Sequence, residues 1–121
     1  MSLVEERTEL LAQAIQESME YQHYLKVKRQ VEQNEILCQK IDYFRYRNFQ
    51  LHISLEGEEL YNAMENFERE NAAFRKDPLV NQFLAAELAL IRMIQRTEKK
   101  LLDAIELELT PSPALDEDED E

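Results

Sequence analysis

The chain has 121 residues, of which 14 are lysine or arginine and 26 are aspartate or glutamate, so its formal net charge is −12. This length fits one domain, and an acidic chain is repelled by nucleic-acid phosphates and by anionic membranes. One glycine and three prolines are too few turn-forming residues for a strand-rich fold. The composition therefore predicts an all-α protein, and it excludes strand-rich and disulfide-stapled folds.

A first helix is expected over Leu3–Gln30. Ser2 and Glu5 form a capping-box pair at its start, because the hydroxyl and the carboxylate can each bind a free backbone N–H group. Asn34 offers an N-cap for the helix that follows. A broad apolar stripe repeats through the first segment at the helical period, and it includes Leu11, Ile15, Ser18 and Leu25.

A second helix is expected over Glu35–Ile53 and a third over Leu55–Lys76, although the pattern alone leaves open whether residues 35–76 form one helix or two. We favour a break, because Ser54 is a good N-cap and the acidic residues after it suit a first helical turn. Gly57 lowers the helix propensity at the same place.

Asp77-Pro78 ends the third helix, because the residue before a proline is disfavoured in α geometry. A fourth helix then runs over Pro78–Leu109. Long helices joined by short connections pack antiparallel, so residues 1–109 are predicted to form an antiparallel bundle of three to four long helices. Residues 110–121 contain two prolines and an acidic run with little apolar surface, which predicts a disordered tail.

Localisation follows from what the sequence lacks. Cys38 is the only cysteine, so no intrachain disulfide can form, which suits a reducing compartment. No apolar run resembles a signal peptide or approaches the roughly 18 residues needed to cross a bilayer. We expect a cytoplasmic protein that does not insert into membranes.

The sequence offers no complete constellation for catalysis or metal binding. Glu20 and His23 have the Glu-x-x-His spacing that can hold a metal on a helix, but di-iron bundles need a second such pair. The other histidine, His52, has Phe49 three residues before it. A Ser-His-Asp arrangement and a glycine-rich phosphate loop are also missing. We expect a non-enzymatic protein with no catalytic residue, no metal, no cofactor and no small-molecule substrate.

His23 suggests one alternative function. The segment His23–Val27 is similar to the His-x-Leu-Lys-Gly motif of histidine phosphotransfer bundles, in which an exposed histidine accepts a phosphoryl group. The glycine of that motif keeps the surface open for a response regulator, and Val27 takes its place here. His23 is therefore an alternative phosphoacceptor.

The stretch Asp42–Phe49 interleaves aromatic residues with arginines, a composition that can stack on bases and contact phosphates. An RNA-binding or RNA-processing cofactor is a second alternative, but the acidic chain leads us to expect no direct nucleic-acid binding. A helix with aromatic residues on several sides is more often packed on several sides. We predict that this surplus forms a surface for self-association, most simply as a dimer, or for other regulatory proteins; its residues are Tyr43, Tyr46, Arg47, Phe49 and Ile53.

Two parts of the chain resemble the YlbF/YmcA-like family of bacterial regulators. The similarity covers about residues 8–107. It rests on Ala14–Tyr21 with Tyr24 and Lys28 in the first helix, and on Phe74–Val80 and Phe83–Glu87 at the turn and the last helix.

The resemblance implies a compact helical domain that self-associates and regulates competence, biofilm formation and sporulation in Gram-positive bacteria. Some relatives act in a complex that influences messenger RNA processing, and they carry cysteines linked to iron–sulfur clusters. Such clusters need several thiolates, whereas Cys38 is alone in this chain. The resemblance therefore implies a regulator or adaptor without a cluster.

Overall fold

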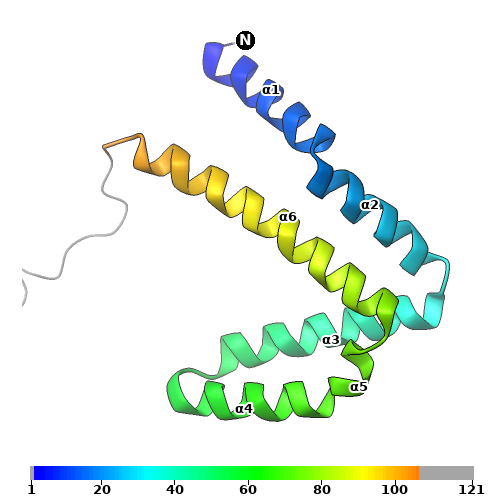
Figure 1. Ribbon diagram of the computed structural model, residues 1–121. Helices are drawn as coiled ribbons and strands as arrows, with labels where there is room; N and C mark the ends of the chain where they lie inside the picture. The colour runs from blue at the N-terminus through cyan, green and yellow to red at the C-terminus, as the bar shows by residue number, and fades with distance from the viewer. Residues whose placement is uncertain (1, 107–121) are drawn as a thin grey trace, which may run out of the picture. The chain divides into compact units, whose positions relative to one another are not determined.

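The computed structural model describes residues 2–106, and this part of the chain is helical apart from short connections. The elements are α1 (Leu3–Glu17), α2 (Met19–Glu32), α3 (Glu35–Ser54), α4 (Gly57–Glu70), α5 (Ala72–Arg75) and α6 (Pro78–Asp103) (Figure 1). The described residues contain no strand, which confirms the all-α class.

Among the described residues, no helix has the length and apolar character required to cross a membrane.

Side-chain caps begin three of the helices where the sequence predicted starts. The Ser2 hydroxyl accepts a hydrogen bond from the backbone N–H of Glu5 at 3.2 Å, and the Asn34 side chain accepts one from Leu37 at 3.0 Å. The Asp77 carboxylate accepts one from the backbone N–H of Leu79 at 2.9 Å, at the start of α6. Each bond satisfies a backbone donor that a helix start leaves free.

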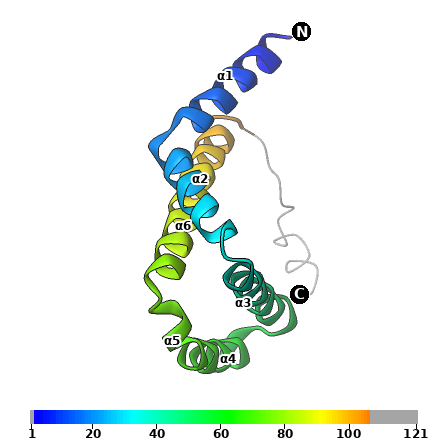
Figure 2. The same ribbon diagram turned by 90° about the vertical axis from the view of Figure 1, so that its right-hand side faces the viewer.

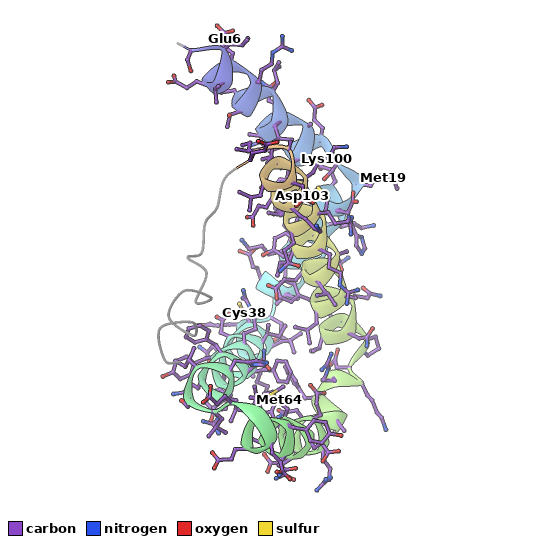
Figure 3. The ribbon with its side chains drawn as sticks, turned by 90° about the vertical axis from the view of Figure 1, so that its left-hand side faces the viewer. Glu6, Met19, Cys38, Met64, Lys100 and Asp103 are labelled. Atoms are coloured by element: carbon purple, nitrogen blue, oxygen red, sulfur yellow. The ribbon has the colours of Figure 1, made fainter. Side chains whose placement is uncertain are left out.

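The predicted continuous helix over Leu3–Gln30 is wrong, because Ser18 interrupts it. Ser18 has extended backbone angles, and its hydroxyl accepts a hydrogen bond from the backbone N–H of Tyr21 at 3.2 Å. The same hydroxyl donates to the carbonyl oxygen of Ile15 at 2.6 Å. Ser18 thus closes α1 and caps α2, so it is not part of an apolar helical stripe. Met19, the first residue of α2, projects into solvent beside this break (Figure 3).

The break between α3 and α4 is confirmed, but the predicted cap at Ser54 is wrong. Ser54 is the last residue of α3, and the backbone N–H of Leu55 closes that helix on the carbonyl oxygen of Leu51. α4 begins at Gly57, whose φ of +62° lies in the left-handed region. Glycine reaches this conformation without the steric cost that other residues bear, so the reversal of the chain depends on it.

The last two predicted helices are also shorter than expected. Asn71 ends α4, and its side-chain amide donates to the carbonyl oxygen of Phe67 at 2.8 Å. The one-turn helix α5 follows, so the third predicted segment, Leu55–Lys76, is not continuous. α6 ends at Asp103 and does not reach Leu109.

The chain divides into two compact units, and the boundary between them lies between Ile91 and Arg92, within α6. The core of the first unit lies where α2, α3, α5 and the start of α6 meet. α3 and α4 form an antiparallel hairpin, which Figures 1 and 2 both show side by side. The wider antiparallel bundle stays a prediction. The buried core residues are Val27, Val31, Ile41, Val80 and Phe83, with Tyr24, Leu37, Cys38, Phe74, Leu79 and Leu84 packed against them.

The second unit begins with the C-terminal half of α6. Here the Thr97 hydroxyl donates to the carbonyl oxygen of Met93, and Lys99 pairs with Asp103 at 2.8 Å. The predicted single domain over residues 1–109 stays a prediction. The predicted disordered tail, residues 110–121, lies outside the described residues.

Candidate interaction surface on α3

α3 carries apolar residues on two opposite sides. One side faces the interior and is buried or half-buried; it comprises Leu37, Ile41, Phe44, Asn48 and Leu51. The five residues predicted as an interaction surface, Tyr43, Tyr46, Arg47, Phe49 and Ile53, are all exposed. Tyr43 is 65% exposed and Ile53 is 66% exposed. A helix packed on one side only does not need these large apolar groups, so their exposure marks a surface available to a partner.

An aromatic cluster holds α3 in place from the inside. The rings of Phe44 and Phe67 stack with centroids 4.9 Å apart, and Phe74 approaches Phe44 at 5.5 Å. The Arg75 guanidinium lies 5.7 Å from the centre of the Phe44 ring and pairs with Glu68 at 2.8 Å. These contacts join α3, α4 and α5, and they fix which side of α3 faces solvent.

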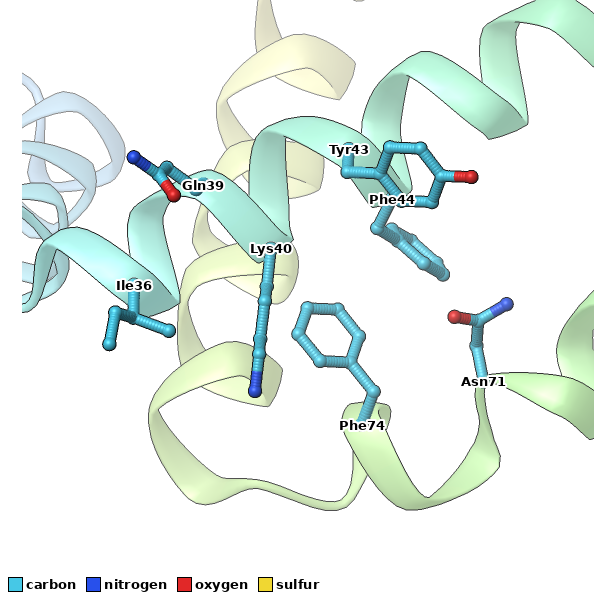
Figure 4. A pocket seen from close by; sticks show the side chains of 7 residues that line it. All are labelled: Ile36, Gln39, Lys40, Tyr43, Phe44, Asn71 and Phe74. Carbon is cyan, nitrogen blue, oxygen red and sulfur yellow. The ribbon is translucent and has the colours of Figure 1, made fainter.

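Beside the exposed side of α3 lies an open groove of about 520 Å³ (Figure 4). α3 forms one wall with Ile36, Gln39, Lys40, Tyr43 and Phe44, and Asn71 and Phe74 form the other. The lining is mainly apolar, and among the described residues that form it only Lys40 is charged. Such a lining suits an apolar side chain of a bound protein better than a charged metabolite.

Hydrogen bonds join part of the predicted surface. The Arg47 guanidinium donates to the side-chain oxygen of Gln50 at 3.1 Å, and the Gln50 amide donates to the Tyr46 hydroxyl at 2.9 Å. Tyr43 lies at the groove, whereas Phe49 and Ile53 lie towards the α4 end of the helix. Ile36 and Lys40 also line the groove but were not among the predicted residues, although Ile36 precedes Tyr43 by two helical turns and therefore lies on the same side.

The two arginines of the aromatic stretch have different surroundings. Arg45 pairs with Glu87 at 3.0 Å and lies 3.7 Å from Asp42, so its charge is used within the chain. Arg47 is exposed. The RNA-binding alternative therefore has less free positive charge at this stretch than the sequence suggested.

The other candidate residues lie apart from this surface. His23 is exposed on α2, while Val27, at the place of the motif glycine, is 2% exposed and belongs to the core. The Nδ1–H group of His52 donates a hydrogen bond to the carbonyl oxygen of Asn48 at 2.8 Å. The part of the chain that the structure describes contains no group of three or more potential metal ligands.

Comparison with known proteins identifies the chain. A family model described as control of competence regulator ComK, YlbF/YmcA, matches residues 4–106. The chain belongs to the YlbF/YmcA family.

This match confirms the resemblance inferred from Ala14–Tyr21 and from the Asp77-Pro78 turn. The description of the YlbF/YmcA family names the control of a regulator and does not name a catalysed reaction. A UPF0342 protein of Caldicellulosiruptor bescii is 30% identical over 98 residues, which cover 79% of this chain and 82% of that protein. No solved structure matches the chain.

Proposed function

We propose that this YlbF/YmcA protein is a cytoplasmic, non-enzymatic regulatory adaptor that acts by binding itself and other regulatory proteins. The exposed side of α3 carries the proposal, because Tyr43, Tyr46, Phe49 and Ile53 present apolar surface to solvent next to a mainly apolar groove. Exposed patches of this kind commonly mark protein–protein interfaces. The family description, control of competence regulator ComK, makes competence the first process to test. The resemblance extends the proposal to biofilm formation and sporulation.

A substitution pair in the native host tests the proposed surface. The double variant Phe49→Ser/Ile53→Ser removes two exposed apolar side chains, so folding should be little affected. Interface hot spots are worth about 2 kcal/mol or more, so we expect transformation frequency to fall by about tenfold or more. Tyr61→Ser is the matched control, because Tyr61 is an equally exposed aromatic residue on α4.

Two results would reject the proposed function. One is normal competence in the Phe49→Ser/Ile53→Ser strain at unchanged protein level. The other is loss of competence in a His23→Gln strain, which would favour the phosphotransfer alternative. If neither result is obtained, photo-crosslinking from position 49 should identify the bound protein directly, with position 61 as the control.

A further inference from the structure

The exposed side of α3 has the spacing of a helix-pairing seam. Six residues follow one another at intervals of three and four positions, the pattern that keeps one stripe of a helix facing a partner helix. Ile36, Tyr43 and Ile53 are about two-thirds exposed. Gln50 is half-buried, and its side chain forms hydrogen bonds with Tyr46 and Arg47. The seam residues are Ile36, Gln39, Tyr43, Tyr46, Gln50 and Ile53.

The order of residue types along this seam is the same from either end: Ile, Gln, Tyr, Tyr, Gln, Ile. A second copy of α3 laid antiparallel across it would therefore place like against like. Ile36 would meet Ile53 of the second copy, and Tyr43 would meet Tyr46. The two glutamines would face each other, where each amide can both donate and accept. A closed two-fold contact pairs one surface with itself, and this order of residue types lets each position meet a compatible one.

We propose that α3 pairs antiparallel with α3 of a second copy, with the two-fold axis between Tyr43 and Tyr46. This inference rests on the self-association part of the proposed function, and it specifies the helix, the direction and the register.

The exposed apolar area is sufficient for such a contact. Ile36, Tyr43, Tyr46, Phe49 and Ile53 are each more than half exposed. Burying each removes on the order of 100 Å², so the two copies together lose about 1,000 Å², close to the lower limit for a specific interface.

The charges beside the seam make the contact a weak one. Lys40 and Arg47 lie on one edge of the seam, at the positions that face each other across an antiparallel helix pair. Lys40 would therefore face Arg47 of the second copy, and the symmetry would repeat this like-charge pair. The repulsion favours a dimer that dissociates readily, which suits an adaptor that exchanges a second copy for another partner.

Sedimentation equilibrium of the purified full chain is the first test. Tyr43→Glu places a charge at the centre of the seam, so we expect the dimer dissociation constant to rise by about tenfold or more. Tyr61→Glu adds the same charge at an equally exposed tyrosine outside the seam, and it should change the constant less than about twofold. A chain that stays monomeric at about 100 µM, a concentration at which even a weak specific dimer forms, or equal effects of the two variants, would overturn the inference. The proposed docking of other proteins would not be affected.

Cysteine cross-linking tests the direction of pairing. Ile36→Cys and Ile53→Cys are made separately in a Cys38→Ser background, and circular dichroism verifies their helical content. In the antiparallel register, position 36 of one copy lies about 25 Å from position 36 of the other, which is too far for a disulfide. A mixture of the two variants should therefore cross-link, whereas each variant alone should not. Cross-linking of each variant with itself would show parallel pairing and reject the proposal.

A charge reversal tests the register. Lys40→Glu replaces each like-charge pair with an opposite pair, so the dimer should tighten severalfold at low salt. Lys28→Glu makes the same change in net charge at an exposed position on α2, and it should leave the dissociation constant nearly unchanged. If Lys40→Glu weakens the dimer, or if Lys28→Glu tightens it equally, the proposed register is wrong.

Discussion

A carboxylate oxygen of Glu87 on α6 lies 3.0 Å from a guanidinium nitrogen of Arg45 on α3. The Glu87 side chain is only 18% exposed, so its charge needs a partner. In the sequence, Glu87 lies on or near the apolar stripe of the last helix, and the ion pair accounts for a charged residue at this place. It also joins α3 to the first half of α6 and so helps to orient the exposed side of α3.

We expect Glu87→Gln to lower the free energy of unfolding by about 0.5–1 kcal/mol, because Arg45 is half exposed and solvent weakens the pair. A double-mutant cycle with Arg45→Met, measured by urea unfolding, isolates the coupling between the two residues. Disrupting the exposed Lys99–Asp103 pair with Lys99→Met should cost less than about 0.5 kcal/mol. A coupling energy of zero for Arg45 and Glu87 would show that the pair contributes nothing.

Phe44 should be the most sensitive position on α3. It is 8% exposed and contacts the rings of Phe67 and Phe74, so Phe44→Ala should destabilise the chain by about 3–5 kcal/mol. The neighbouring exposed Tyr43 should tolerate alanine within about 0.5 kcal/mol. Chemical denaturation of both variants measures the contrast, and similar losses at the two positions would contradict the assignment of buried and exposed sides.

The helix break at Ser18 depends on its hydroxyl. Ser18→Ala removes the cap of α2 and should cost about 1 kcal/mol, whereas Ser18→Asp keeps an acceptor and should cost less. Ser2→Ala removes a comparable cap at an exposed end and should cost less than about 0.5 kcal/mol. If Ser18→Ala raises the free energy of unfolding, the chain is more stable with one continuous helix than with the break, as the sequence first suggested.

Gly57 tests the turn between α3 and α4. A Cβ atom added there would meet no other atom within 4 Å, so the cost of Gly57→Ala comes from the backbone alone. A left-handed residue other than glycine costs about 1–2 kcal/mol, and asparagine is tolerated better than alanine. We expect the melting temperature of the Gly57→Asn variant to lie between those of the unchanged protein and of the Gly57→Ala variant. Equal stability of the glycine and alanine forms would show that the turn relaxes to another conformation.

Truncation after Leu109 tests whether the acidic end supports the fold. The removed residues contain few apolar groups, so the melting temperature should change by no more than a few degrees. A larger fall, measured by circular dichroism against the full chain, would show that this segment contacts the folded part.

Local physical chemistry made several features predictable from the sequence alone. The scarcity of glycine and proline determined the all-α class. Capping groups at Ser2 and Asn34 placed two helix starts, and Pro78 placed the start of the last helix. The helix starts depend on neighbours within a few positions, so no knowledge of the tertiary structure was needed. The family came from a resemblance instead, carried by Ala14–Tyr21 with Tyr24 and Lys28 and by Phe74–Val80 and Phe83–Glu87.

The tertiary structure decided what depends on distant partners. Ser18 is a different case, because helix continuation and capping compete there within three residues, and the hydrogen bonds to Ile15 and Tyr21 show that capping prevails. Phe44 and Tyr43 are adjacent aromatic residues, yet only Phe44 meets Phe67 and Phe74. The side of α3 that faces solvent is thus set by residues far along the chain, and a helical period cannot distinguish two apolar sides of one helix.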